Sequence, residues 1–366
     1  MTKIDDYLKL MVDSDASDLF LSTGSPPYLK INGATKMLDA PKFAPGEVQS
    51  LAYGIMNERQ RAQFELTLES NFAFTVENVG RFRVNAYRQR GEVSLAMRHI
   101  RLLIRNFEQL GLPPESAELS MLKRGLVLLV GAAGSGKSTS IAAMIDYRAR
   151  NADNHILTIE DPIEFLFPQR RSLVDQREVG VDTLSFGDAL RNAMRESPDV
   201  IMIGEIRDME TAQHAIAYAE AGQLCIATMH SNNANQAIDR IINFFPVAAH
   251  KQLLMDLSLN IEGVISHRLV SGIKGSRVLA VEVLRHSAYI AEMIREGRLD
   301  QIKPEMQKGN QAGVKTFDQS LFELYKAGRI SREETLLNAD SRVDLDLKIR
   351  LYGKDPAAGA KTQKPI

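Results

Sequence analysis

Apolar positions in residues 1–102 follow both a helical and an alternating period. Ile4, Leu8 and Met11 recur at helical spacing, whereas other runs alternate apolar and polar residues between turns rich in glycine and proline. Such a mixture predicts a small α+β domain. The predicted helices lie at residues 4–12 and 48–68, and the predicted strands at 18–22, 28–32, 80–87 and 93–100.

The pattern changes after residue 121, where short and almost continuously apolar runs alternate with helical stretches. Strands of this kind are buried on both faces, as in a mainly parallel sheet that helices cover. We therefore predict an α/β domain over residues 121–356. Its four predicted strands lie at 126–130, 156–159, 200–203 and 224–228.

Two segments carry no clear period. Residues 103–120 contain Gly111, Pro113 and Pro114 and are predicted to link the two domains. Residues 357–366 are mostly small or polar and are predicted to form a disordered tail.

The composition narrows the class of protein. The 366 residues carry a net charge of −1, which argues against a general nucleic-acid binder, because such proteins have a basic excess. Cys225 is the only cysteine, which excludes a disulfide framework or a cysteine zinc site and favours the cytoplasm. The first 25 residues lack the apolar core of a signal peptide, and every apolar run is too short to cross a bilayer. We expect membrane association only through a partner.

The segment from Gly131 to Ser138 matches the phosphate-binding pattern G-x-x-x-x-G-K-[ST] at every fixed position. Glycines let backbone N–H groups wrap around phosphate oxygens, and the helix expected to start near Lys137 points its positive end at them. Lys137 would neutralise the β- and γ-phosphates of ATP, and the Ser138 hydroxyl would bind Mg²⁺. The alternative is a chance lysine in a glycine-rich turn, which the flanking strand and helix disfavour. The predicted nucleotide-binding residues are Gly131, Ala132, Ala133, Gly134, Ser135, Gly136, Lys137, Ser138 and Thr139.

An acidic segment follows the second predicted strand of the α/β domain, at the carboxyl end where open α/β sheets bind ligands. Glu160, Asp161 and Glu164 lie so close in sequence that they are not all ionised cheaply unless a cation or water shares the site. One could orient an attacking water and another could support Mg²⁺. Their spacing does not decide which, and an acidic surface loop is the alternative.

Glu205 and His230 follow the next two predicted strands. Glu205 would hold Mg²⁺ through water, as the carboxylate that a phosphate-binding loop requires, or it is a surface residue past a core strand. His230 is either a γ-phosphate sensor or a structural histidine. Arg191 and Arg195 share a helix face before Glu205 and either contact phosphate or a neighbouring subunit, or are exposed.

Arginines cluster in the first domain. Arg81, Arg83 and Asn85 share one face of the strand at 80–87, and Arg98 lies on the following strand. Such a cluster on a rigid sheet suits stabilisation of γ-phosphate charge. A solvated sheet face is the simpler interpretation.

Four ordered motifs together resemble those of secretion ATPases: an Asp box, a Walker B segment, a His box and the arginine-bearing strand of an N-terminal PAS-like domain. They lie at residues 158–164, 190–208, 221–231 and 80–85, and the resemblance runs from about residue 3 to 350. Within this superfamily the chain is similar to the type IV pilus retraction ATPases, the PilT/PilU family. Assembly and export ATPases typically carry a longer N-terminal extension and a tetracysteine zinc motif.

The resemblance implies a hexameric ring in which each chain has a PAS-like domain followed by a RecA-like ATPase domain, with nucleotide held between them. It implies Glu164 as catalytic base, Glu205 on Mg²⁺ through water, and His230 as a sensor. The first-domain residues implied to reach the nucleotide phosphates are Arg81, Arg83 and Arg98. It also implies docking on an inner-membrane platform protein of the pilus machine, and therefore a cytoplasmic protein that is peripheral at that membrane.

The phosphate-binding loop and the segments 241–246 and 344–351 resemble the PilU branch more than the PilT branch. Gln223 stands where the family often has a histidine, and residues 289–297 keep only part of the PilT pattern A-I-R-N-L-I-R-E-G. We therefore predict an accessory PilU-type ATPase that works with a PilT-type partner. A ring subunit that binds ATP without hydrolysis and scaffolds the partner is one alternative, which the intact carboxylates disfavour. A DNA-transfer ATPase is the other, which the nearly neutral charge disfavours.

Overall fold

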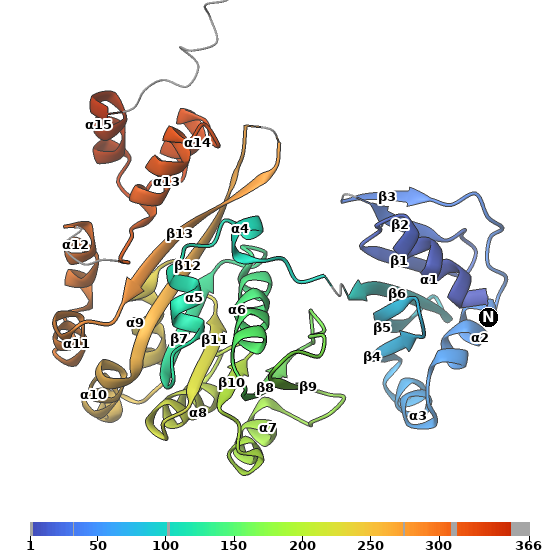
Figure 1. Cartoon of the computed structure of the whole chain (residues 1–366). Helices are drawn as coiled ribbons and strands as arrows, with labels where there is room; N and C mark the ends of the chain where they lie inside the picture. Colours follow the sequence, from blue (N-terminus) through green and yellow to red (C-terminus); the bar gives the residue numbers. More distant parts are fainter. Residues whose placement is uncertain (1–2, 32, 101–102, 274, 309–312, 353–366) are drawn as a thin grey trace, which may run out of the picture. The chain divides into compact units, whose positions relative to one another are not determined.

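The computed structural model describes residues 3–31, 33–100, 103–273, 275–308 and 313–352. Its contacts divide the chain into two compact units (Figure 1). The first unit comprises the residues up to Leu103 and the segments Ile163–Pro168 and Gly180–Asp182, and the second comprises the remainder. The predicted disordered tail at 357–366 lies outside the described residues.

One antiparallel sheet organises the first unit, with strand order β3-β2-β1-β6-β5-β4. Burial alternates along β5, which buries Phe82, Val84 and Ala86 and turns the intervening residues outward, as the sequence predicts. The elements of this unit are α1 (Lys3–Asp13), β1 (Asp18–Ser22), β2 (Tyr28–Ile31), β3 (Ala34–Met37), α2 (Glu47–Ile55), α3 (Glu58–Thr67), β4 (Glu69–Val76), β5 (Gly80–Gln89) and β6 (Glu92–Ile100).

The predicted helix at 48–68 is two helices, so this prediction was wrong in part. Met56 adopts an extended backbone, and Asn57 then caps α3 by accepting a hydrogen bond from the backbone N–H of Gln60. The side-chain oxygen of Gln60 in turn accepts a hydrogen bond from the backbone N–H of Asn57. Strands β3 and β4 were missed because they are the two edges of the sheet, where little burial is needed to pair a strand.

A seven-stranded sheet organises the second unit, and helices lie on both of its faces (Figure 1). Its strands are β7 (Gly125–Gly131), β8 (His155–Glu160), β9 (Leu173–Glu178), β10 (Val200–Ile203), β11 (Leu224–Met229), β12 (Ile261–Ser271) and β13 (Arg277–Arg285). Its helices of eight or more residues are α6 (Lys137–Asn151), α7 (Phe186–Ala193), α8 (Met209–Glu220), α9 (Ala234–Asn243), α10 (His250–Asn260), α11 (Ala288–Arg295), α13 (Phe317–Lys326) and α15 (Arg342–Tyr352). The shorter helices are α4 (Phe107–Leu110), α5 (Glu115–Ser120), α12 (Ile302–Gln307) and α14 (Arg332–Leu337), with 3₁₀ turns at Met194–Glu196, Val247–Ala249 and Leu299–Gln301.

The strand order of this sheet is β13-β12-β7-β11-β10-β8-β9, and every neighbouring pair is parallel except β12 with β13. Strands β7, β8, β10 and β11 confirm the four predicted ones. The other three strands lie toward the edges and carry charged residues or histidine, which interrupt the apolar runs that marked the central strands. Because the central strands are parallel, their carboxyl ends meet at one edge of the sheet.

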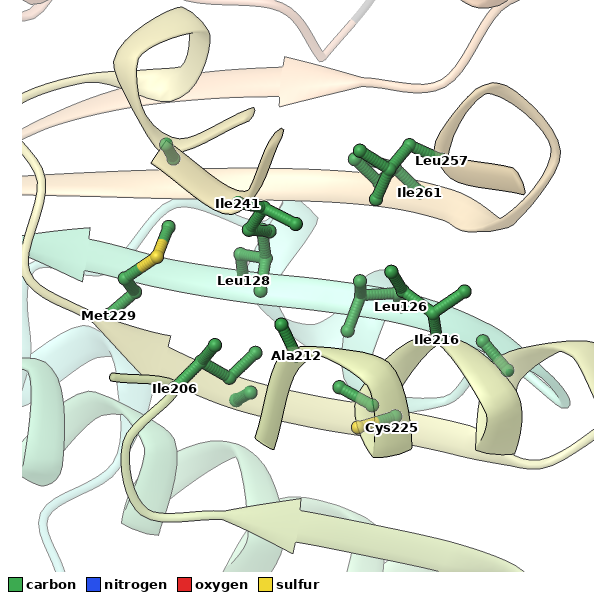
Figure 2. Close-up of a cluster of buried hydrophobic side chains, with 14 of the residues drawn as sticks. Leu126, Leu128, Ile206, Ala212, Ile216, Cys225, Met229, Ile241, Leu257 and Ile261 are labelled. Atoms are coloured by element: carbon green, nitrogen blue, oxygen red, sulfur yellow. The ribbon is translucent and has the colours of Figure 1, made fainter. Parts of the chain in front are cut away.

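The core on one face of this sheet joins strands and helices that are distant in sequence. Figure 2 shows Leu126 and Leu128 of β7 and Cys225 of β11 converging with Ile216 of α8 and Ile241 of α9. All five side chains are less than a tenth exposed. Burial raises the pKa of Cys225, so its thiol stays protonated and acts as a small apolar core group.

The segment predicted as a linker carries α4 and α5, and both belong to the second unit. Asn106 begins α4 with a capping box, and Arg148 of α6 donates hydrogen bonds to the carbonyl oxygens of Ser120 (2.8 Å) and Leu122 (2.6 Å). Helices this short show no period in the sequence. At the other end of the unit, α13, α14 and α15 form a small core with the outer ends of β12 and β13. Among the described residues, no helix has both the length and the apolar character that crossing a membrane needs.

Candidate functional site

The predicted phosphate-binding loop joins β7 to α6 in the second unit. Gly131 has φ of 155°, and a Cβ there would lie 2.5 Å from Ser135 Oγ and 2.8 Å from the carbonyl oxygen of His267. Only glycine therefore lets the loop turn so close to β12. Gly136 has φ of 95° and precedes the first residue of α6, which is 15 residues long. The free N–H groups and dipole of that helix face the loop, and this is the backbone arrangement that an anion site needs.

The side chain of Lys137 is held over the loop by carbonyl oxygens of the loop backbone. This side chain is 8% exposed, and Nζ donates hydrogen bonds to the carbonyl oxygens of Gly131 (2.8 Å) and Ala132 (3.0 Å). Burial lowers the pKa of Lys137, while the charge of Glu205 acts in the opposite direction. Next to it, Ser138 is exposed and Thr139 is half-buried in the first turn of α6. A buried ammonium group beside free N–H groups is suited to phosphate.

Three of the predicted site residues come together at the carboxyl edge of the sheet. Lys137 Nζ lies 3.3 Å from His230 Nδ1, 93 positions further along the chain, and His230 Nε2 lies 3.3 Å from Glu205 Oε1. An ammonium group can only donate, so His230 Nδ1 accepts and Nε2 carries the proton toward Glu205. The neighbouring strands β7, β11 and β10 deliver these side chains, as the parallel arrangement requires.

The acidic segment after β8 divides into residues with different surroundings. Glu160 is buried and accepts hydrogen bonds from Thr158 Oγ1 (2.8 Å) and Gln176 Nε2 (3.1 Å). Asp161 lies 3.6 Å from Nη1 of Arg207. Glu164 is exposed and belongs by its contacts to the first unit. Glu160 and Asp161 therefore have different partners, and Glu160 is bonded to residues of the sheet itself.

The arginines of the first unit lie on a paired and partly solvated sheet face. Arg83 and Arg98 are direct partners across β5 and β6, where two like charges are unfavourable unless other groups compensate. Arg98 Nε lies 2.8 Å from Asp18 Oδ1, and Arg83 Nη2 lies 3.1 Å from Glu164 Oε1. The Arg98 side chain remains 53% exposed and that of Arg83 25%, and Arg81 is half-buried. The face can still offer positive charge to a ligand.

Three further positions singled out in the sequence have structural or exposed surroundings. Arg191 forms exposed ion pairs with Asp188 in its own helix and with Glu210 of α8, and Arg195 is exposed, which agrees with the surface interpretation. Gln223 precedes β11, and its carbonyl oxygen accepts a hydrogen bond from Gly125 at the start of β7 (3.0 Å). His230 follows the opposite end of β11, so a histidine at position 223 would not join it within this unit.

Sequence analysis missed a buried carboxylate that is hydrogen-bonded to the start of the helix after the His230 segment. Glu282 of β13 is 1% exposed and accepts hydrogen bonds from the backbone N–H of Ala234 (2.9 Å) and from Ser266 Oγ (3.1 Å). Ala234 is the first residue of α9, which directly follows the segment that bears His230. Burial raises the pKa of Glu282, against the two hydrogen bonds. Nothing in the sequence indicated this role, because Glu282 is a single glutamate in a strand that was not predicted.

The protein ligands available to a metal are few. Within the described ranges, no group of three or more His, Cys, Asp or Glu side chains gathers closely enough to hold a metal ion. The chemistry that this edge of the sheet offers is a pre-organised anion site with a neighbouring carboxylate. That combination fits a Mg²⁺ ion shared between phosphate oxygens, waters and one or two protein oxygens.

Known proteins resemble the chain over nearly its full length. Residues 3–319 match the family described as type II/IV secretion system proteins. The chain is 46% identical over 351 residues to the type IV pilus ATPase PilU of Pseudomonas aeruginosa, covering 96% of this chain and 92% of that relative. It is 42% identical over 330 residues to the type IV pilus retraction ATPase PilT of the same organism, covering 90% and 96% respectively.

A solved structure has the same fold. The crystal structure of the pilus retraction motor PilT with bound ADP superposes with a TM-score of 0.89 at 43% sequence identity, covering 95% of this chain and 100% of that one. The mixed α/β prediction and the resemblance to the PilT/PilU family are thereby confirmed.

Proposed function

The chain belongs to the family of type II/IV secretion system proteins, and we propose that it is an ATP-hydrolysing hexameric motor that powers type IV pilus retraction. Identity to PilU exceeds identity to PilT, 46% against 42%, which favours the accessory PilU-type role beside a PilT-type partner. The observation that carries the proposal is the contact chain from Lys137 through His230 to Glu205 at the end of a glycine loop.

ATP phosphates would bind at residues 131–139. The amides of the loop and the first turn of α6 would surround the phosphates, and Lys137 would exchange its loop carbonyls for phosphate oxygens. Ser138 would hold Mg²⁺ directly and Glu205 through water. When bound, Mg²⁺ neutralises charge on the β- and γ-phosphate oxygens. His230, fixed between Lys137 and Glu205, would respond to the presence of the γ-phosphate.

Two groups of the first unit complete the proposed chemistry. Glu164 would act as the base that takes a proton from the attacking water, and Arg81, Arg83 and Arg98 would stabilise the charge of the leaving phosphate. The ion pair between Arg83 and Glu164 would have to open before both could act. In this proposal residues 1–102 are a PAS-like domain and residues 121–356 a RecA-like domain, to whose unit α4 and α5 of the segment 103–120 belong.

The assembly we propose is a homo-hexamer that works with a PilT-type ATPase and docks on an inner-membrane platform protein of the pilus machine. It would lie in the cytoplasm, peripheral to the inner membrane, and would reach that membrane only through its partners. The 46% identity to PilU over 96% of the chain supports this placement.

The deciding experiment measures pilus retraction in cells that lack this protein, its PilT-type relative, or both. We expect the single deletion to weaken retraction and twitching, and a plasmid copy carrying Lys137→Ala not to restore them. Phosphate release by the purified protein, alone and with its partner, is measured in parallel. Retraction that is unchanged by the deletion would contradict the motor role, and absent phosphate release even with the partner would indicate a non-hydrolysing scaffold.

A further inference from the structure

A groove lies between α14 and α15, the last two helices of the described chain. Its volume is about 570 Å³, which is within the range of binding sites. We call it the C-terminal groove. Its described lining residues are Arg332 and Leu336 of α14, and Arg342, Val343, Asp346, Leu347 and Arg350 of α15.

Helix α15 carries apolar side chains on two of its faces. Leu345 and Ile349 are 2% and 4% exposed and pack into the small core formed with α13. Val343, Leu347 and Leu351 recur every four residues and are 80%, 56% and 63% exposed. This spacing places the second set in one stripe along the helix, and two of its members line the C-terminal groove. Contiguous apolar surface outside the core marks a site of interaction.

The charged side chains of the C-terminal groove are mostly positive. Three arginines line it, against the single carboxylate of Asp346 among its described lining residues, which leaves a surplus of two positive charges. Arg332 Nη2 lies 2.5 Å from Asp346 Oδ1, and Arg350 Nη2 lies 2.6 Å from Asp346 Oδ2. The side chains of these two arginines nevertheless remain 50% and 69% exposed. One carboxylate therefore already serves two guanidinium groups, and the groove can accept further negative charge.

Two neighbouring carboxylates are hydrogen-bonded elsewhere. Asp344 accepts a hydrogen bond from Ser341 Oγ (2.6 Å), Glu334 accepts one from the backbone N–H of Ser271 (2.8 Å), and neither lines the groove. The sequence after α15 does not match the groove either, because residues 353–366 carry three lysines against one aspartate. Their apolar residues are alanine, proline and one isoleucine. An occupant that is both acidic and rich in large apolar side chains must therefore come from another molecule.

We propose that the C-terminal groove binds an acidic amphipathic helix of a partner protein. The apolar face of that helix lies on Val343 and Leu347, and its carboxylates pair with the arginines of the groove. A helix laid into a groove in this way is held by apolar anchors at helical spacing, while the flanking charges set its orientation. A flat anionic membrane fits less well, because it reaches only the rim of a concave groove. The inference does not depend on the binding of ATP.

Fluorescence anisotropy of a labelled synthetic helix tests the proposal on the full-length protein. The probe is a helical peptide of about 15 residues with leucine on one face and glutamate on both flanks. A second probe carries lysine in place of every glutamate. We expect the glutamate peptide to bind with a Kd on the order of 10–100 μM, and the lysine peptide to bind at least about tenfold more weakly.

Two variants and two matched controls locate the binding. Arg342→Glu reverses one charge at the first residue of α15, where an acidic side chain favours the helix, and Leu347→Ser removes the centre of the apolar stripe. Each should weaken binding of the glutamate peptide at least about tenfold. Arg59→Glu and Leu259→Ser, at exposed positions of α3 and α10, should leave binding within about twofold of the wild type. Phosphate release should be the same in all four variants, because none of them alters the proposed ATP site.

Equal binding of the two peptides, or unchanged binding in both Arg342→Glu and Leu347→Ser, would overturn the proposal. Sedimentation with phosphatidylglycerol vesicles tests the membrane as occupant: vesicle binding that these variants abolish, without peptide binding, would also overturn it. So would a change in the oligomeric state of Leu347→Ser without peptide binding, since the occupant would then be a second copy of this chain. Absent phosphate release by the wild type would refute the proposed ATPase, whereas peptide binding, measured without nucleotide, would still support this inference.

Discussion

The two sheets of this protein place charged residues in opposite ways. In the parallel sheet of the second unit, Lys137 is 8% exposed and meets His230 and Glu205 where three neighbouring strands end. In the antiparallel sheet of the first unit, Arg83 and Arg98 lie in the middle of their strands, and Arg98 is half exposed. The parallel sheet collects its charges at one edge, whereas the antiparallel sheet displays them across a face.

This difference determines how much each charge can contribute. A buried charge interacts strongly with a bound phosphate, because little water screens it, but its position must be fixed by the fold. A solvated ion pair contributes little to stability and can exchange partners readily. The second unit is therefore suited to hold a ligand, and the arginine face of the first unit is suited to change partners. The following variants test that contrast.

The largest effect is expected from Lys137→Ala. Removing the one buried ammonium group at the loop should lower kcat for ATP hydrolysis by roughly 10²–10³-fold, the size of effect seen when a charge-stabilising group is deleted. Steady-state phosphate release measures it, and Lys123→Ala, at an exposed lysine before β7, is the control. A folded Lys137→Ala protein with normal turnover would remove Lys137 from the site.

Glu282→Ala tests whether the buried Glu282 stabilises the second unit by joining β12 to the start of α9. The change leaves the Ala234 N–H and the Ser266 hydroxyl without their partner, so we expect the free energy of unfolding to fall by roughly 2–4 kcal/mol. Urea unfolding measures it. Glu282→Gln keeps an accepting oxygen and should remain within about 1 kcal/mol of the wild type. Equal losses in the two variants would mean that the charge matters, and not the hydrogen bonds.

The buried imidazole of His267 should make stability depend on pH. Its pKa falls to about 3 in the folded protein, so below pH 6.5 the unfolded chain binds a proton that the folded chain excludes. Stability is therefore complete above pH 6.5 and declines as the pH falls, by about 2 kcal/mol at pH 5. Urea unfolding of the wild type and of His267→Gln at pH 7 and pH 5 isolates this contribution. Identical slopes in both proteins would show that position 267 does not titrate in this way.

The smallest effect on stability is expected at the arginine face. Arg83→Ala and Arg98→Ala each remove a partly solvated ion pair, which is typically worth less than about 1 kcal/mol. Thermal unfolding measures this. If these arginines act on the nucleotide, ATP hydrolysis should nevertheless fall at least about tenfold. Arg88→Ala is the control, since Arg88 lies on the same strand but pairs with Glu65. Turnover equal to that of Arg88→Ala would favour a merely solvated face.

Much of the second unit could be predicted from local sequence patterns. The central strands were predicted because strands buried on both faces must be apolar throughout, and β7, β8, β10 and β11 follow that rule. The glycine loop was predicted because its backbone conformation excludes side chains, as at Gly131. Prediction failed where that rule does not apply: β3, β4, β9, β12 and β13 were missed because they are partly exposed or carry charged residues within the strand, and the break between α2 and α3 depends on the single cap of Asn57.

The sequence by itself determined the phosphate-binding loop, the central strands that lead into the site, and the family resemblance, because each rests on residues close together in the chain. Only the tertiary structure decided that His230 lies between Lys137 and Glu205, that Gln223 lies at the opposite end of β11, and that Glu282 of β13 joins Ser266 of β12 to the first residue of α9. Those relations depend on strand order. Residues far apart along the chain become neighbours only when the sheet is assembled, and no local pattern of apolar and polar positions records that order.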